Sequence, residues 1–208
     1  MSSEESQQRP ERSRGDARPL RQLTDPKAMR AVAHPTRLAL LEALVQREPL
    51  TATEAAEVIG ESPTNCAFHL RTLAKYGFVE EAGEAPGRRR PWRLKHIGFS
   101  VDTDQGDAEM SHASEALAQL LWETWLNRAS MVNARRSRFE GPWLQVTSGN
   151  ENLAYVTPEE AQQLLADVLE VLDRYRDRLE DPSRRPPESL PVEMLLFAFP
   201  LDATKPEA

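Results

Sequence analysis

The feature that most constrains this chain is a pair of helix signals set close together. Thr51 and Glu54 have the spacing of a capping box, and Gly60 can adopt the left-handed conformation that ends a helix. Ser62-Pro63 then starts a second helix at once, and this helix runs to Gly77 with an apolar stripe on one side. Two short helices joined by a tight turn that contains glycine form a helix-turn-helix, so the sequence predicts this motif here.

Two further helices are predicted before the motif. Asp25 is a good N-cap and Pro26 suits the first helical position, so a helix begins there, and His34-Pro35 interrupts it. Residues 35–46 then form the next helix, because four apolar residues recur in it at helical spacing: Leu38, Leu41, Leu44 and Val45. This spacing marks a face that is buried in a core.

A hairpin is predicted after the motif. Residues 78–82 and 91–97 are short runs typical of strands, and the glycine, proline and charged residues of 83–90 indicate an extended loop between them. Four helices followed by a hairpin is the order of a winged helix-turn-helix, which we place at residues 22–100. The expected fold class is α+β and mostly helical.

This part of the chain resembles a known family. The segments AVAHPTRLALLEAL and TATEAAEVIGESPTNCAFHLRTLAKYGFVEE are similar to the bacterial arsenic-repressor (ArsR-like) winged-helix transcription regulators, roughly over residues 22–97. In that family HPTRL opens the second helix, and a serine followed by HLR, a leucine and a glycine spans the recognition helix. The resemblance implies a homodimeric, sequence-specific DNA-binding regulator, a repressor acting on an inverted repeat, and it leaves the signal unidentified.

The second helix of the motif carries the residues expected to contact DNA. An advance of about 100° per residue places Cys66, Leu70 and Leu73 on a buried face. The opposite face and its flank then present polar and basic side chains and one phenylalanine: Thr64, Asn65, Phe68, Arg71, Thr72 and Lys75. We expect Thr64 and Asn65 to contact bases, and Arg71 and Lys75 to contact phosphates, because the N-terminal residues of a recognition helix lie deepest in the major groove. For any single residue, an exposed position without a partner stays open.

His69 lies at the edge between the two faces. We expect it either to contact a phosphate or to form a hydrogen bond in the core. Arginines are expected at the tip of the hairpin and on its returning strand: Arg88, Arg89, Arg90 and Arg93. Beside a recognition helix such a tip meets phosphates or enters a narrow minor groove, and a solvated turn is the alternative. Trp92 and Phe78 are expected to pack and anchor the hairpin.

A metal site is not predicted. Cys66 and His69 are three residues apart on a helix and are a legitimate zinc pair, but tight tetrahedral binding needs four ligands. The other histidines are scattered, and the grouping of Asp107, Glu109, His112 and Glu115 is only a loose match to a ligand set. We expect Cys66 to act as a small hydrophobic core residue, and we expect no cofactor.

The second half is expected to hold a long helix over residues 107–137, inside a dimerisation segment at 101–140. Its apolar residues cover more than one face, so it has to be covered on two sides. A homodimer interface is predicted through Leu117, Leu121, Trp125 and Val132. Burial within one subunit is the alternative.

Residues 141–208 are expected to form a small strand-helix-strand module of unknown role. The predicted strands are 153–156 and 192–201, and the helix between them begins at the capping box Thr157–Glu160 and ends near residue 179. A small apolar effector could bind the aromatic residues of this half, which are otherwise core: Trp122, Trp125, Trp143 and Tyr155.

The net charge of −7 hides an asymmetry. Residues 9–21 carry a net charge of +3 and residues 22–97 a charge of +2, whereas residues 98–208 carry −10. This pattern is compatible with a nucleic-acid reader attached to an assembly or sensing module, and equally with an ordinary acidic surface. The polar tail at 1–21 is expected to be disordered, with DNA contact by its arginines as the minority alternative.

Several classes of protein are excluded or disfavoured. A single cysteine excludes an intramolecular disulfide, no apolar run approaches the roughly 18 residues of a membrane span, and the N-terminus lacks the apolar core of a signal peptide. We therefore expect a cytoplasmic protein that contacts no membrane. No catalytic motif is visible, so an enzyme is not expected. The alternatives to a DNA-binding regulator are a ligand- or protein-binding module that uses the winged helix as a platform and, less favoured, a metal-responsive switch.

Overall fold

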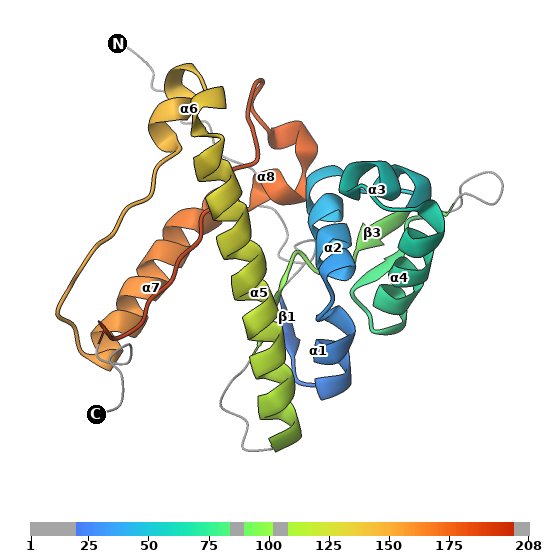
Figure 1. Ribbon diagram of the computed structural model, residues 1–208, viewed down its shortest axis with the longest axis horizontal. Helices are drawn as coiled ribbons and strands as arrows, with labels where there is room; N and C mark the ends of the chain where they lie inside the picture. Colours follow the sequence, from blue (N-terminus) through green and yellow to red (C-terminus); the bar gives the residue numbers. More distant parts are fainter. Residues whose placement is uncertain (1–19, 84–89, 102–107, 202–208) are drawn as a thin grey trace, which may run out of the picture.

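The computed structural model describes residues 20–83, 90–101 and 108–201 (Figure 1). Four helices make up the N-terminal half of the fold: α1 Pro26–Val32, α2 Pro35–Arg47, α3 Ala52–Ile59 and α4 Pro63–Lys75. The predicted helix-turn-helix is confirmed as α3 and α4. The mostly helical α+β fold class is confirmed as well, since the strands form only small two-stranded sheets.

Side chains at the helix starts explain these boundaries. Thr51 and Glu54 form both bonds of a capping box at α3, and the Ser62 hydroxyl accepts a hydrogen bond from the backbone N–H of Asn65 at α4. At α2 the cap is His34, whose Nδ1 accepts from the backbone N–H of Thr36 at 3.2 Å. Each of these bonds satisfies a backbone donor that would have no partner inside its helix.

The predicted hairpin is confirmed by two antiparallel strands. β2, Val79–Glu81, pairs with β3, Trp92–Leu94, in a register that places Glu80 opposite Arg93. Leu50, just before α3, forms a further bridge to Trp92. This bridge and the packing of Phe78 and Trp92, which are 4% and 8% exposed, attach the hairpin to the helices as expected.

A second small sheet was not predicted. β1, Arg21–Leu23, pairs in parallel with β4, Phe99–Val101, so it joins the two ends of the winged-helix part of the chain. Residue 21 had been assigned to the disordered tail, and that end of the assignment was wrong. Residues 1–19 lie outside the described residues, so the rest of the assignment stays a prediction.

One hydrophobic core serves the winged helix and the start of the long helix α5, Ala108–Ala134. Its fully buried side chains come from six elements: Leu23, Met29, Val32, Leu40, Leu44, Cys66, Leu70, Leu73, Val79 and Leu117. Burying a large aliphatic side chain stabilises the fold by roughly 1.5–3 kcal/mol, so this cluster is the main source of stability. Figure 1 shows α5 running past α1 and α2 and then continuing beyond the first four helices toward α6.

The long helix is confirmed close to its predicted bounds, but Leu117 was assigned wrongly. Its side chain is 0% exposed within one chain, in the core that α5 shares with α1, so it has no surface to offer a second subunit. Leu121 and Trp125 are half-buried, and Val132 is 39% exposed. The apolar residues in the first half of α5 are therefore buried within one subunit, whereas the second half has apolar residues at the surface.

The C-terminal part consists of short helices joined by extended chain: a 3-10 turn η1 Arg136–Arg138, α6 Gly141–Val146, α7 Pro158–Asp173, α8 Asp177–Glu180 and a 3-10 turn η2 Pro182–Arg184. The capping box at Thr157 is confirmed. The strands predicted at 153–156 and 192–201 were wrong: of these residues, none of those the structure describes is in a strand. An apolar run becomes a strand only where a partner strand accepts its backbone hydrogen bonds, and local sequence does not supply that partner. Across the described ranges, no helix has the length and apolar character needed to cross a membrane.

Candidate nucleic-acid interface

The outer face of α4 is the centre of the candidate interface. Thr64, Arg71 and Lys75 are exposed, and the Phe68 ring is 57% exposed between them. The opposite face is buried in the core, where Cys66 is 0% exposed. The helical phase expected from the sequence is therefore observed, and α4 presents two basic residues, a hydroxyl and an aromatic ring in one row.

Two polar residues on the flank of this row already make hydrogen bonds. The Asn65 side-chain amide donates to Glu61 Oε2 at 3.0 Å, and the Thr72 hydroxyl donates to the backbone carbonyl of Phe68 at 3.1 Å. Asn65 keeps its amide oxygen and a second amide hydrogen for other partners. The bond to Glu61 therefore orients the Asn65 amide and leaves its remaining donor and acceptor able to bind other groups.

His69 lies in the core, and its assignment as a DNA contact was wrong. The residue is 6% exposed, and its ring centroid lies 4.5 Å from that of His34. Burial, the adjacent His34 and the charge of Arg37 lower the pKa of His69, although Glu61 raises it slightly in opposition. A neutral, buried imidazole is not placed to meet a phosphate.

Cys66 behaves as the hydrophobic core residue that we expected. It is fully buried, and burial, followed by the nearby charge of Glu61, raises the pKa of its thiol. Raising the pKa keeps sulfur in the protonated form, which does not ligate metal ions. Over the described part of the chain, no three His, Cys, Asp or Glu residues gather to hold a metal ion.

The described arginines of the hairpin are held by carboxylates across the sheet. Arg93 pairs with Glu80 at 2.7 Å, and Arg90 pairs with Glu81 at the same distance. All four side chains are substantially exposed, so these ion pairs are weak and can exchange for phosphates at little cost. Arg88 and Arg89 lie outside the described residues, and their DNA contact stays a prediction.

A basic pocket beside α4 was not predicted from the sequence. Its volume is about 260 Å³, and its lining comes from α1, α2 and the end of α4: Lys27, Arg30, Ala31, Arg37, Thr72 and Tyr76. The signal was weak, because two of its cations, Lys27 and Arg30, look like an ordinary solvated face of a short helix. Only the packing of α1 on α4 brings them to the same place as Arg37 and Tyr76.

The aromatic residues suggested for an apolar effector do not form one pocket. Trp122 and Trp125 both lie near the Phe197 ring, at centroid distances of 4.3 Å and 6.3 Å, so a residue of the same chain covers part of their surface, and Trp122 remains 42% exposed. Tyr155 is 98% exposed, and Trp143 makes no ring contact within the described residues. These four residues therefore do not form one shared site among the described residues, and an apolar effector stays a prediction.

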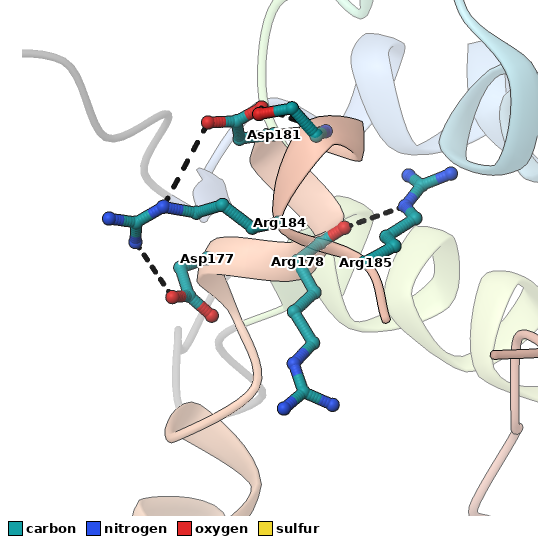
Figure 2. A network of polar contacts seen from close by, with 6 residues as sticks. Asp177, Arg178, Asp181, Arg184 and Arg185 are labelled. Carbon is teal, nitrogen blue, oxygen red and sulfur yellow. Dashed lines mark hydrogen bonds and ion pairs between the residues drawn. The ribbon is translucent and has the colours of Figure 1, made fainter. Parts of the chain in front are cut away.

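A cleft of about 850 Å³ lies elsewhere, between the base of the hairpin and the turn that follows α7. Figure 2 shows how this turn is held: Arg184 reaches Asp177 at 2.7 Å and Asp181 at 3.9 Å, and the Arg185 guanidinium donates to the carbonyl of Arg178. Both signs of charge line the cleft, since Arg93 and Lys95 lie there together with Glu80 and Asp181. This mixture favours no class of ligand.

Comparison with known proteins places the α3–α4 unit in a known type of domain. Residues 32–82 match the model of a helix-turn-helix domain. This helix-turn-helix domain extends from the last residue of α1 to just beyond β2, and it includes all of α4. No curated protein matches the sequence.

Two solved structures show a distant likeness. The DNA complex of MepR from S. aureus is 16% identical, covers 53% of this chain and 86% of its own, and aligns with a TM-score of 0.28. A MepR mutant from a multidrug resistant S. aureus clinical isolate is also 16% identical, covers 72% of this chain and 86% of its own, and gives the same TM-score of 0.28.

Proposed function

We propose that this chain is a sequence-specific DNA-binding regulator of transcription that acts as a homodimer on an inverted repeat, in the manner of the ArsR-like family it resembles. The observation that carries the proposal is the outer face of α4. There a row of exposed side chains, Thr64, Phe68, Arg71 and Lys75, stands opposite a fully buried stripe on the second helix of a helix-turn-helix domain. A recognition helix needs this division, since it docks on its own domain with one face and enters the major groove with the other.

Each exposed residue has a role that its chemistry suits. Thr64 and Asn65 sit in the first turn of α4, where the helix would lie deepest in the groove, so they would contact bases. Arg71 and Lys75 sit further along the same row and would contact phosphates. The apolar ring of Phe68 would pack against a thymine methyl group or the sugar edge.

The hairpin would act as the wing. Arg90 and Arg93 are held by Glu81 and Glu80 in exposed ion pairs, and DNA would replace these carboxylates with phosphates. Arg88 and Arg89 follow β2 and precede β3 in the sequence, so in this proposal they would add phosphate contacts beside the groove that α4 enters.

The second half of α5 supports a homodimer. Four large apolar side chains there are exposed on a helix that leaves the core: Trp122 by 42%, Leu126 by 52%, Met131 by 53% and Val132 by 39%. The apolar side of α7 is also uncovered, with Leu165 at 43% and Leu169 at 53%. Apolar patches of this kind on a soluble chain mark surfaces that another chain covers. A two-fold dimer through this region would place two α4 helices for the two halves of an inverted repeat.

The family resemblance favours repression as the mode of regulation. A protein that binds DNA in this way would be located in the cytoplasm. In this proposal the acidic second half provides assembly, and no cofactor takes part. The charge pattern agrees, because the positive charge of residues 22–97 lies in the part that would meet DNA.

Selection of bound sequences from random duplex DNA tests the proposal. The full chain should select a palindromic consensus, and Thr64→Ala should relax the preference at one position in each half-site by about 1–3 kcal/mol. Arg71→Ala should weaken binding to all sequences and reduce the slope of log K against log salt by about 0.9 per lost phosphate. Arg174→Ala, an exposed arginine at the end of α7, is the matched control and should change neither.

Light scattering on the same samples tests the dimer. Leu126→Asp and Met131→Asp should shift the chain toward the monomer and weaken binding to the palindrome more than binding to a half-site. Recovery of random sequences with no consensus from the unaltered chain would rule out specific DNA recognition.

A further inference from the structure

The basic pocket beside α4 has a lining suited to one kind of ligand. Lys27 and Arg30 reach it from α1, Arg37 from α2, and Thr72 and Tyr76 from the last turn of α4. The polar groups of these side chains are three cations and two hydroxyls, and none of the described residues that line the pocket is a carboxylate. The Thr72 hydroxyl already donates to the carbonyl of Phe68 and would have to exchange that bond for one to a ligand. Its volume of about 260 Å³ would hold several water molecules at about 30 Å³ each, which is room for a phosphate group with its ester substituent.

Arg37 is the residue that most needs a partner there. Its Nε is buried and makes no hydrogen bond to any part of the chain that the structure describes. Burial lowers the pKa of the Arg37 guanidinium, and the Tyr76 side chain offsets this only in part. A buried guanidinium donor without an acceptor is unfavourable, and an anion in the pocket would supply both the acceptor and the opposite charge.

The surrounding charges also favour an anion. Lys27 makes no side-chain ion pair within the described residues, and Lys75 Nζ lies 5.5 Å from the Tyr76 ring centroid, close to the pocket. Two carboxylates of the described residues contact pocket residues: Asp25 accepts a hydrogen bond from the backbone N–H of Lys27 at 3.0 Å, and Glu109 of α5 pairs with Arg30 at 2.7 Å. Both partners of that pair are at least half exposed, so it is weak and leaves Arg30 able to turn toward a ligand.

We propose that this pocket binds a phosphate group, with Lys27, Arg30 and Arg37 as its cationic ligands and the hydroxyls of Thr72 and Tyr76 as additional donors. The phosphate comes either from the DNA backbone or from a free phosphorylated molecule. The DNA source rests on the proposed function: Thr72 and Tyr76 belong to the end of α4, so a backbone phosphate beside the major groove would reach the pocket while Thr64 contacts bases. In that arrangement α1 and α2 extend the DNA contact beyond α4 and the wing.

Two pocket variants and one control test this site. Lys27→Gln removes an exposed cation and leaves the core untouched, and Arg37→Gln removes the guanidinium whose Nε is buried. Arg47→Gln is the matched control, because it removes an exposed charge from the far end of α2, about 15 Å along the helix from Arg37. The Lys27→Gln variant keeps the test valid if Arg37→Gln does not fold.

Two measurements on the full chain distinguish the sources. The first is the salt dependence of binding to a duplex of random sequence, where each lost phosphate contact reduces the slope by about 0.9. The second is the rise in melting temperature caused by inorganic phosphate, compared with chloride at equal ionic strength.

A smaller salt slope in the pocket variants, with the control unchanged, identifies a DNA phosphate. An unchanged slope, with phosphate stabilising the unaltered chain and the control but neither pocket variant, identifies a free phosphate ligand. The proposal is overturned if the pocket variants match the unaltered chain in both measurements. Failure of the unaltered chain to bind DNA at all would refute the proposed function, and the phosphate arm would still decide the pocket.

Discussion

At the scale of single residues, the pair His34 and His69 joins the start of α2 to the buried side of α4. His34 Nδ1 accepts a backbone hydrogen bond and caps α2, while its ring lies against the His69 ring, with centroids 4.5 Å apart. Burial is the main reason that the pKa of each histidine is lowered, and the charge of Arg37 acts in the same direction. Glu61 opposes both shifts and does not cancel them.

This pair predicts a loss of stability in acid. Both folded-state pKa values lie below the ordinary value of 6.5, so the unfolded chain binds more protons as the pH falls. The stability that the neutral pair contributes is complete above pH 6.5 and is lost as the pH falls through the lowered pKa values. Melting temperatures measured from about pH 8 to about pH 5 should fall steadily below neutrality.

His69→Phe, which keeps a ring of similar size in the core, should flatten that decline. His112→Gln changes an exposed histidine at the start of α5 and is the control, with a profile like that of the unaltered chain. If the melting temperature of His69→Phe fell with pH as steeply as that of the unaltered chain, the buried histidine pair would not be the cause of the decline.

At the scale of elements, the turn between α3 and α4 depends on one backbone conformation. Gly60 has φ of +74° and ends α3, and its N–H donates to the carbonyl of Ala56. A Cβ at this position would meet nothing within 4 Å. Any cost of a side chain here is therefore a cost of backbone conformation, because L-residues, unlike glycine, avoid positive φ.

Gly60→Ala should lower the free energy of unfolding by about 1 kcal/mol, measured by urea denaturation. Gly149→Ala is the matched control: a Cβ there also meets nothing within 4 Å, and Gly149 is not among the glycines with positive φ. The control should be neutral or slightly stabilising, because alanine restricts the unfolded chain. Equal effects of the two substitutions would show that the left-handed turn contributes nothing to stability.

At the scale of the whole molecule, Arg128 connects three parts of the chain. Its guanidinium donates two hydrogen bonds to Glu42 of α2, at 3.0 Å and 2.6 Å, and its Nε lies 3.3 Å from Glu193 in the C-terminal segment. Burial alone would lower the pKa of Arg128, but the hydrogen bond and charge of Glu42 and the charge of Glu193 raise it overall. The cluster joins the winged helix to the part of α5 that lies beyond the core.

A double-mutant cycle on Arg128→Gln and Glu42→Gln should give a coupling energy of about 1–2 kcal/mol, because the pair is bidentate and half-buried. Arg30 and Glu109 also link α5 to the winged helix, through one bond with both side chains at least half exposed. Their cycle is the comparison and should give no more than about 0.5 kcal/mol. Equal coupling energies in the two cycles would mean that the pair of Arg128 and Glu42 contributes no more than an ordinary surface ion pair.

The local structure of the winged helix could be predicted because its signals are local. Capping residues, prolines at helix starts and Gly60 act on backbone groups a few residues away, so α1 to α4 were placed close to their observed bounds. The outward row on α4 followed from helical phase and the identity of the buried stripe. Cys66 was assigned to the core for the same reason.

The predictions that failed concern neighbours far apart in the chain. Leu117 was assigned to a dimer interface and His69 to DNA contact, but Leu117 lies in the core that α5 shares with α1, and the His69 ring packs against that of His34. Residues 192–201 have the composition of a strand and find no partner strand, whereas Arg21–Leu23 has no strand pattern and pairs with Phe99–Val101. Short strands depend on their partner for hydrogen bonds, and a local pattern does not identify that partner.

The order of α1 to α4, the helix-turn-helix and the phase of α4 follow from the residues alone, because caps, turns and helical periodicity act over one or two turns. Three features exist only once the chain is folded: the pocket of Lys27, Arg30 and Arg37, the burial of Leu117 and the Arg128 cluster. Each depends on a contact between elements distant in sequence, and burial, charge and hydrogen bonding at such a contact are properties of packing.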